Sequence, residues 1–422
     1  MRRRTRPSSR PPHAVTALAL LLAAVLGGAG LVALVETREW TRNGALGAAP
    51  RRGMSVRDVG VVTAARAERT APTGARDADV VITAAFTIHR ADDGVRAYQR
   101  FLLTLRQHFA GPVVIFVERE PGPEGAPLPD TISELCSRLG VELEFVDFDG
   151  TGWRQVVWDP EAERWRLWGN EWGLREMLRE RFRWYADACA RMTDTGRCLA
   201  TDFRDVYFQA DPFARAPAGA DLVLAQEPAA YGVGLTIRED VDFDAKWLRD
   251  CYGDAALELI GDEAIVCAGT LIGTPSALRV YHDELFVDDA ARECNDQAIL
   301  NFRLYTGDLE RAFARHGLRV EVERFGAGTV ATVGTLNAKC VDVVAGETVV
   351  ASVDSCRSDR AIDRERGLFL NDDGSVPAVV HQYDRVPALV DILEEITREL
   401  RRLDEEEVVR SSIADAMTMP RA

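Results

Sequence analysis

The sequence predicts an α/β fold built on a Rossmann-like, mostly parallel sheet. Largely apolar runs lie within residues 79–85, after Asp79, and at 113–117, and such runs are typical of strands covered on both faces. Residues 95–109 lie between these runs, and their apolar side chains recur at helical spacing. A second helix at 132–139 and a third strand at 141–146 complete a βαβαβ unit, which favours a parallel sheet.

The elements after this unit continue the alternation of strands and helices. The loop at 87–94 lacks Gly-x-Gly-x-x-Gly, which disfavours a dinucleotide-binding oxidoreductase. Five tryptophans between residues 153 and 172 suit either core packing, the favoured interpretation, or a platform for sugars. We expect further strands from 198, at 221–227, within 319–354 and at 379–384, helices at 174–192, from 296 and at 386–409, and a disordered tail after 409.

The N-terminal region predicts a membrane anchor. Five arginines within residues 1–13 precede an uncharged apolar run at 14–35, long enough to cross the roughly 30 Å hydrocarbon core as a helix. The positive-inside rule predicts a type II membrane protein, with a cytosolic N-terminus and a lumenal (Golgi-like in a eukaryote) or extracytoplasmic body. A cleavable signal peptide is the alternative to this signal-anchor, although its apolar region is normally only about 7–15 residues.

Composition limits the remaining possibilities. The chain has 422 residues, of which 47% are hydrophobic, enough for one large α/β domain or two modest ones. We expect a flexible stem at 36–76, a catalytic domain at 77–386, and a C-terminal helix and tail at 387–422. The net charge of −16 repels phosphate backbones and disfavours nucleic acid as a partner. Nothing in the sequence indicates an oligomeric state.

The eight cysteines all follow the predicted anchor, on the side of the membrane that permits disulfides. Cys340 and Cys356 flank a predicted hairpin and are the best candidates for a pair. No Cys-x-x-Cys occurs, which disfavours a zinc ribbon or a thioredoxin-type redox site.

Residues 198–213 contain the strongest candidate site. A short apolar strand leads into Asp202 and Asp205, and the segment closes on Asp211-Pro212. Ligands of open α/β sheets bind at the carboxyl ends of strands, and carboxylate oxygens there suit Mg²⁺ or Mn²⁺ bridging a diphosphate. An ordinary strand followed by a polar turn is the alternative interpretation.

Three later segments supply further candidates. Gly269 permits close approach of the backbone to a ligand, or simply tight packing. Asp296 and Gln297 begin a helix, where an acid also complements the helix dipole. His381 lies in a late apolar run, where a histidine alone is more often a core residue than a ligand.

The order of these segments resembles the GT-A class of nucleotide-sugar glycosyltransferases, over roughly residues 78–385. In that class a strand reads Asp-x-Asp and runs on to Asp-Pro, and Asn/Cys-x-Gly and Asp-Gln-x-x-x-Asn follow. The resemblance implies a GT-A-like domain that transfers a hexosyl or pentosyl group from a nucleotide-sugar donor to a glycan or glycoprotein acceptor. A divalent metal would stabilise the diphosphate leaving group.

The resemblance also implies roles for individual residues. Asp205, six residues before Asp211, matches the second acid of the family motif and is the preferred metal ligand. Asp202 is implied as an accessory ligand, His381 as a third, and Asp296 as the catalytic acid that contacts donor or acceptor. The donor is expected to contact Asp202, Arg204, Gly269, Thr270 and Gln297.

The acid motif departs from the family pattern. It reads Asp202-Phe-Arg-Asp205, so the first acid of Asp-x-Asp would fall on Phe203. Arg204 can supply part of the charge neutralisation that a metal would otherwise provide. A catalytically inactive GT-A-like domain that binds glycans or a partner is therefore the main alternative. A glycoside hydrolase is disfavoured because no feature pairs two carboxylates across a cleft.

Overall fold

The chain divides into two units, and the computed structural model describes residues only in the second, Asp58–Ala422. The predicted anchor at 14–35, the stem at 36–76 and the cysteines Cys340 and Cys356 lie outside the described residues. Among the helices that are described, none is both long enough and apolar enough to span a bilayer. The described ranges are 78–86, 94–118, 128–146, 156–159, 164–167, 171–228, 234–286, 294–336, 341–344, 347–350 and 361–418.

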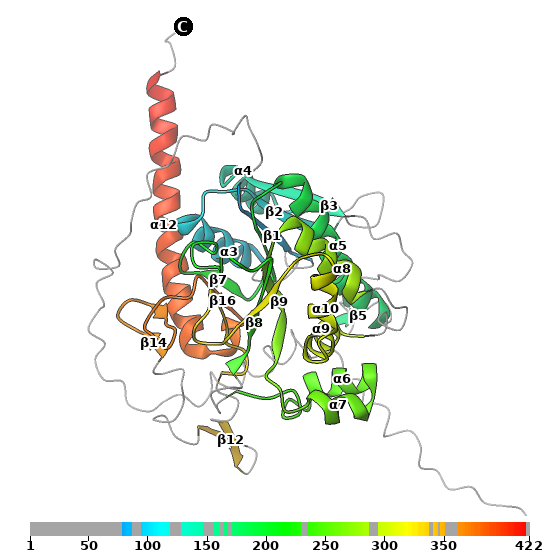
Figure 1. Ribbon diagram of the computed structural model, residues 1–422. Coiled ribbons are helices and arrows are strands. Elements are labelled where there is room, and N and C mark those ends of the chain that lie inside the picture. The colour runs from blue at the N-terminus through cyan, green and yellow to red at the C-terminus, as the bar shows by residue number, and fades with distance from the viewer. Residues whose placement is uncertain are drawn as a thin grey trace, which may run out of the picture. The chain divides into compact units, whose positions relative to one another are not determined.

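The described residues form a seven-stranded central sheet in the order β10-β8-β9-β6-β1-β2-β3 (Figure 1). Its strands are β1 Val80–Ala84, β2 Val113–Glu118, β3 Val141–Val146, β6 Cys198–Thr201, β8 Leu222–Gln226, β9 Val266–Gly273 and β10 Val320–Glu323. Strand β9 runs antiparallel to both of its neighbours, and the other pairs are parallel. The predicted α/β class with a mostly parallel sheet is therefore confirmed.

Helices cover both faces of this sheet. They are α3 Gly94–His108, α4 Asp130–Arg138, α5 Glu171–Met192, α6 Asp244–Tyr252, α7 Asp254–Ile260, α8 Pro275–Leu285, α9 Asp296–Tyr305, α10 Asp308–Arg315 and α12 Pro387–Thr418. Along β1, Val80 and Ile82 pack in the core with α5 and α8, whereas Val81 packs in the core with α3 and α4. This alternation explains why the strand is apolar at every position except Thr83.

The helix ends follow local sequence signals. Thr274 caps α8 by accepting a hydrogen bond from the Ala277 backbone N–H, and Pro275 occupies the first turn, where its missing N–H costs nothing. Helix α12 continues to Thr418 instead of ending at residue 409 as expected. The physical reason is that no glycine or proline interrupts the chain before Pro420.

A second, three-stranded sheet in the order β11-β16-β7 lies beside the first. It comprises β7 Val206–Phe208, β11 Val330–Thr332 and β16 Val379–His381. Three two-stranded hairpins add β4 Val156–Asp159 with β5 Arg164–Leu167, β12 Val341–Val344 with β13 Glu347–Val350, and β14 Ile362–Asp363 with β15 Leu368–Phe369. The β12–β13 hairpin confirms the one expected between Cys340 and Cys356.

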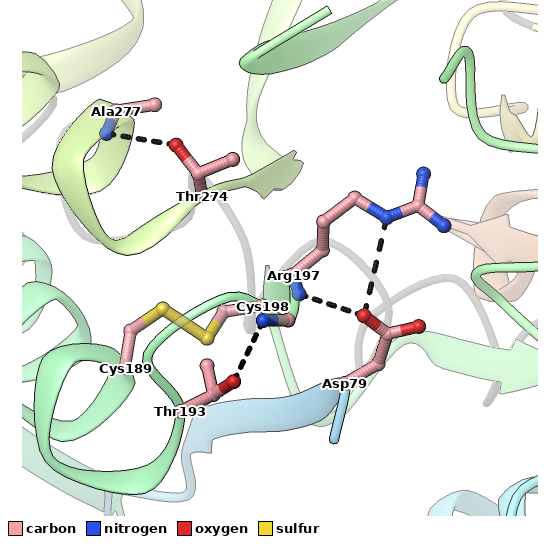
Figure 2. The surroundings of a disulfide bond; sticks show 8 residues. Asp79, Cys189, Thr193, Arg197, Cys198, Thr274 and Ala277 are labelled. Atoms are coloured by element: carbon pink, nitrogen blue, oxygen red, sulfur yellow. Dashed lines mark hydrogen bonds and ion pairs between the residues drawn. A yellow bond between two sulfur atoms is a disulfide. The ribbon is translucent and has the colours of Figure 1, made fainter. Parts of the chain in front are cut away.

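Two disulfides connect described residues. Cys189 at the end of α5 is bonded to Cys198 at the start of β6, and Cys251 in α6 is bonded to Cys294 just before α9. Figure 2 shows the first of these bonds beside Arg197, whose backbone N–H donates to the Asp79 carboxylate at 2.7 Å. The strand that leads into the acid motif is thus fixed covalently at its start.

Candidate metal centre

Pairing in the small sheet brings two distant segments together. Asp202 follows the last residue of β6, and Asp205 immediately precedes β7. His381, the last residue of β16, lies opposite Val206 in the antiparallel β16–β7 pair. Asp202, Asp205 and His381 each place one potential ligand atom within 4.8 Å of the other two. We call these three residues the metal triad.

The metal triad fits a divalent cation. His381 is fully buried, and within the described part of the chain its Nε2 has no hydrogen-bond partner. This atom lies 3.4 Å from Asp202 Oδ2 and 3.7 Å from Asp205 Oδ1. A buried polar atom without a partner costs roughly 1–3 kcal/mol, which coordination to a cation would offset. One imidazole and two carboxylates are suitable ligands for Mn²⁺.

The position of Gly269 on β9 completes the cradle. A Cβ atom here would lie 2.4 Å from Asp202 Oδ2 and 2.6 Å from His381 Cε1, so only glycine leaves room for both side chains. The Gly269 carbonyl also accepts a 2.6 Å hydrogen bond from the Asp202 N–H. Because 32% of the Asp202 side chain and 13% of the Asp205 side chain remain exposed, a ligand can reach the triad from solvent.

The two carboxylates of the triad have opposite electrostatic environments. Desolvation alone would raise the pKa of Asp202, but Arg181 and His381 outweigh it and hold this pKa below its usual range. Desolvation raises the pKa of Asp205, and the neighbouring charges of Asp202 and Asp384 add to this rise. Desolvation opposes protonation of His381, yet the thiol of Cys267 and the two carboxylates raise its pKa well above the usual value. The cluster therefore favours positive charge, as a proton or a cation.

Arg181 on α5 connects the triad to the start of α9. Its guanidinium donates from Nη1 to Asp202 Oδ1 at 2.5 Å and from Nη2 to Asp296 Oδ2 at 2.7 Å. Desolvation raises the pKa of Asp296, against the opposing charge of Arg181. Both carboxylates are thus oriented by one buried arginine, and Asp202 keeps Oδ2 available to a ligand.

Residues outside the metal triad also contact His381 and Asp205 and help to orient them. Cys267 Sγ lies 3.6 Å from His381 Nδ1, on the side of the ring away from the carboxylates. The Gln382 N–H donates to the Asp205 carbonyl at 2.8 Å, and Gln382 adopts a left-handed backbone conformation with φ of 60°. Such contacts fix the tautomer and orientation of a metal-binding histidine.

The other predicted donor-binding residues lie at varying places around the triad. Arg204 Nη2 donates to Asp384 Oδ2 at 3.0 Å, and the charge of Arg204 opposes the rise in the pKa of Asp205. Thr270 is fully buried in β9, where its hydroxyl lies 2.9 Å from that of Thr201. Gln297 accepts a hydrogen bond from the Ala268 N–H at 3.3 Å, so it lies beside Gly269. The structure thus brings Gly269 to the triad directly and Asp296 to it through Arg181.

Arg181 and two buried acids near the site are not apparent from the sequence. Arg181 falls four residues after Met177 and four before Tyr185, so an arginine on the apolar stripe of that helix was the available signal. Gln297 Nε2 donates to both carboxylate oxygens of Asp244, at 3.1 and 3.0 Å. Glu227, at the end of β8, accepts a hydrogen bond from Thr335, and desolvation raises its pKa to about 7. No local motif marks these two acids.

Comparisons with known proteins give only remote similarities. No family model matches the chain, and no curated protein does. Core-mannan synthase A from Aspergillus fumigatus, in a Mn/GDP form, is 10% identical with a TM-score of 0.33, and the match covers 67% of this chain and 80% of that one. Mouse xyloside xylosyltransferase 1, in its apo form, is 10% identical with a TM-score of 0.29, covering 72% and 97% respectively. We therefore base the function on the geometry of the site itself.

Proposed function

We propose that this protein is a GT-A-type glycosyltransferase that moves a sugar from a nucleotide-sugar donor to a glycan or glycoprotein acceptor. The observation that supports this most directly is the metal triad of Asp202, Asp205 and His381 at the carboxyl end of β6. Acids at this edge of an open α/β sheet lie where such folds bind their ligands. The α/β fold and the order of the later segments agree with the proposal.

Each residue of the metal triad would contribute a ligand atom to Mn²⁺ or Mg²⁺. Asp205 and His381 would bind the cation together with Asp202 Oδ2, because Asp202 Oδ1 is already engaged by Arg181. When bound, the cation supplies charge stabilisation to the departing diphosphate. The two carboxylates provide the negative charge that attracts the cation, and the buried imidazole fixes its position.

Asp296 is the proposed acid that contacts the donor or acceptor sugar. Its carboxylate is almost fully buried and is oriented by Arg181, which also orients Asp202. The two acids are therefore fixed relative to each other by one guanidinium, and a sugar bound at Asp296 would lie near the cation. Gln297, beside Gly269, is proposed to line the same pocket.

An inactive domain that binds glycans or a partner is the alternative. The observation that favours it is the Arg181 guanidinium, which already neutralises part of the charge on Asp202 and Asp296. Hydrolysis or transfer of a nucleotide-sugar distinguishes the two. The active enzyme should consume one donor in a panel with Mn²⁺ and lose that activity in EDTA, whereas the inactive domain consumes none under either condition.

A thermal-shift screen of nucleotide-sugars tests donor binding separately from turnover. A ligand at about 100 times its Kd stabilises the folded state by about 2.7 kcal/mol, enough to raise the melting temperature visibly. The proposal requires one donor whose shift depends on Mn²⁺. A shift with free glycans and none with any nucleotide-sugar would instead support the inactive binding domain.

We also propose that residues 14–35 anchor the protein as a signal-anchor, with residues 1–13 cytosolic and the body lumenal or extracytoplasmic. The apolar run and the arginines before it support this topology. Protease protection in sealed vesicles, with a tag at each end, tests it. Digestion of the C-terminal tag by protease on the cytosolic side would show that the protein has the opposite orientation. Loss of the N-terminal tag on maturation would indicate a cleaved signal peptide.

A further inference from the structure

Helices α3 and α12 line a cavity of about 170 Å³ that is open to solvent, on a part of the molecule that the proposed function does not use. Its lining includes Arg96, Arg100, Glu394, Thr397, Arg398 and Arg401. Figure 1 shows α12, coloured orange to red, running beside α3, and the two helices are in contact. Residues nearly 300 positions apart therefore meet there, which makes the cluster a product of the fold.

The charge of this cavity is opposite to that of the chain. Four arginines and a single glutamate line it, whereas the chain as a whole has a net charge of −16. Within the described ranges, Arg96 and Arg398 form no ion pair, and Arg401 approaches only Glu405, at 3.9 Å. The four arginines that line this space give it a positive charge that favours a bound anion.

A buried hydroxyl provides the second indication of a ligand. Thr397 is only 8% exposed, lines the cavity, and has no hydrogen-bond partner for Oγ1 among the residues that the structure describes. A threonine within a helix commonly bonds to a backbone carbonyl of the preceding turn, as Thr104 does with the Arg100 carbonyl. The Thr397 hydroxyl remains available to an occupant of the cavity.

We propose that the α3–α12 cavity is a binding site for a phosphate group. Guanidinium groups match phosphate oxygens in a bidentate geometry, and a hydroxyl supplies a further donor. The phosphate belongs either to a free anion or to a lipid headgroup, and both present the same oxygens to the arginines. Glu394 at the same cavity offsets part of this charge, and the four arginines leave the cavity net positive.

Titration calorimetry of the full-length protein with inorganic phosphate, at constant ionic strength, tests the proposal. Saturable binding to one site is expected, and Arg398→Gln and Arg96→Gln should each weaken it about tenfold, the effect of losing one charge-assisted hydrogen bond. Thr397→Val, which keeps the side-chain shape, should weaken it several-fold. Arg410→Gln is the matched control, because Arg410 lies on the same helix, pairs with Glu407 and does not line the cavity.

Flotation with phosphatidylcholine vesicles, with and without phosphatidate, identifies the source of the phosphate. A gain in flotation with phosphatidate over phosphatidylcholine alone, which Arg398→Gln abolishes, would indicate a lipid headgroup. Calorimetric binding without any such gain would indicate a free phosphate compound. The proposal is wrong if neither probe binds, or if Arg410→Gln weakens binding as much as Arg398→Gln does. If the arginine variants have the melting temperature of the native protein, any loss of phosphate binding arises at the site and not from unfolding.

Discussion

Strands β1, β2 and β3 and strands β6, β8 and β9 form one sheet, yet they differ in what they bury. In the first group, β1 and β2 bury valine, isoleucine and phenylalanine, and the hydroxyl of buried Thr83 donates to the Thr201 carbonyl at 2.7 Å. In the second group, β6 is followed by Asp202 and β8 by the buried acid Glu227, and Gly269 of β9 lies against the buried His381 of β16. The first group of strands, which we call the first half, is therefore a scaffold. The second group, the second half, holds buried charges whose unfavourable electrostatic free energy a bound cation would reduce.

This contrast predicts that substitutions in the two halves separate stability from metal binding. The largest effect should come from Asp205→Asn. The variant removes one of three ligands, so Mn²⁺ binding, measured by electron paramagnetic resonance, should weaken. Sugar transfer should fall about a thousandfold, because metal stabilisation of a leaving group is worth several kcal/mol. Without metal, the variant should be at least as stable as the native protein, because desolvation and neighbouring acids penalise the Asp205 charge.

Ile115→Ala in β2 is the matched substitution in the first half. Ile115 is fully buried, and deleting its side chain should cost about 2–5 kcal/mol of unfolding free energy. Its Mn²⁺ affinity, measured on the folded fraction, should equal that of the native protein. A clear loss of affinity in this variant, or a large loss of stability in Asp205→Asn, would mean that the two halves are not separable.

Glu227→Gln tests the electrostatic cost of burying the Glu227 carboxylate, because this cost depends on pH. The folded pKa of about 7 exceeds the usual value of 4.5, so between these pH values the folded state binds more protons than the unfolded state. Stability therefore falls as pH rises through this window, by up to about 3 kcal/mol in total. Glutamine cannot titrate, so the variant should lose this fall and be the more stable protein at about pH 8.

Urea unfolding at roughly pH 5 and pH 8 measures this difference. Glu258→Gln is the control, because Glu258 lies on the surface of α7 with an 81% exposed side chain. The interpretation fails if Glu227→Gln and Glu258→Gln change with pH in the same way.

The sequence was sufficient for the scaffold half and for part of the site. Apolar or alternating strands and helices with 3.6-residue spacing depend on local pattern, so the sequence predicts β1, β2 and β3 at nearly their observed bounds. The two acids were found because they follow an apolar strand directly. The late histidine was chosen by resemblance, and its contact with the acids depends on the β16–β7 pairing, which no local pattern specifies.

The residues that the sequence did not reveal all act across long separations. Arg181 meets Asp296 over 115 positions, and Glu227 meets Thr335 over 108. A single arginine on a helix or a single acid after a strand is common, so only tertiary structure distinguishes these from surface residues. Conversely, Arg204 is adjacent to the acids in sequence but pairs with Asp384, because successive residues at a turn point in different directions.

Gly269→Ala and Gly273→Ala compare the middle of β9 with its last residue. The new methyl at 269 would lie 2.4 Å from Asp202 Oδ2 and displace the carboxylate, so Mn²⁺ affinity and transfer should fall about a hundredfold. The methyl at 273 meets Leu278 Cδ2 at 2.9 Å, an apolar contact that should cost about 1–3 kcal/mol of stability without changing Mn²⁺ affinity. Equal loss of affinity in both variants would show a general distortion of β9.

The smallest expected effect is that of Cys267, which contacts His381 on the side away from the carboxylates. Cys267→Ala leaves Nδ1 without this partner and should weaken Mn²⁺ affinity about tenfold, as substitutions behind metal-binding histidines typically do. Cys267→Ser retains a hydrogen-bonding group and should recover most of the loss. Isothermal titration calorimetry with Mn²⁺ distinguishes these outcomes. Equal affinities in the native protein and both variants would mean that His381 is oriented by packing alone. An equal loss of affinity in both variants would mean that the size of the sulfur atom, and not its hydrogen bond, positions the ring.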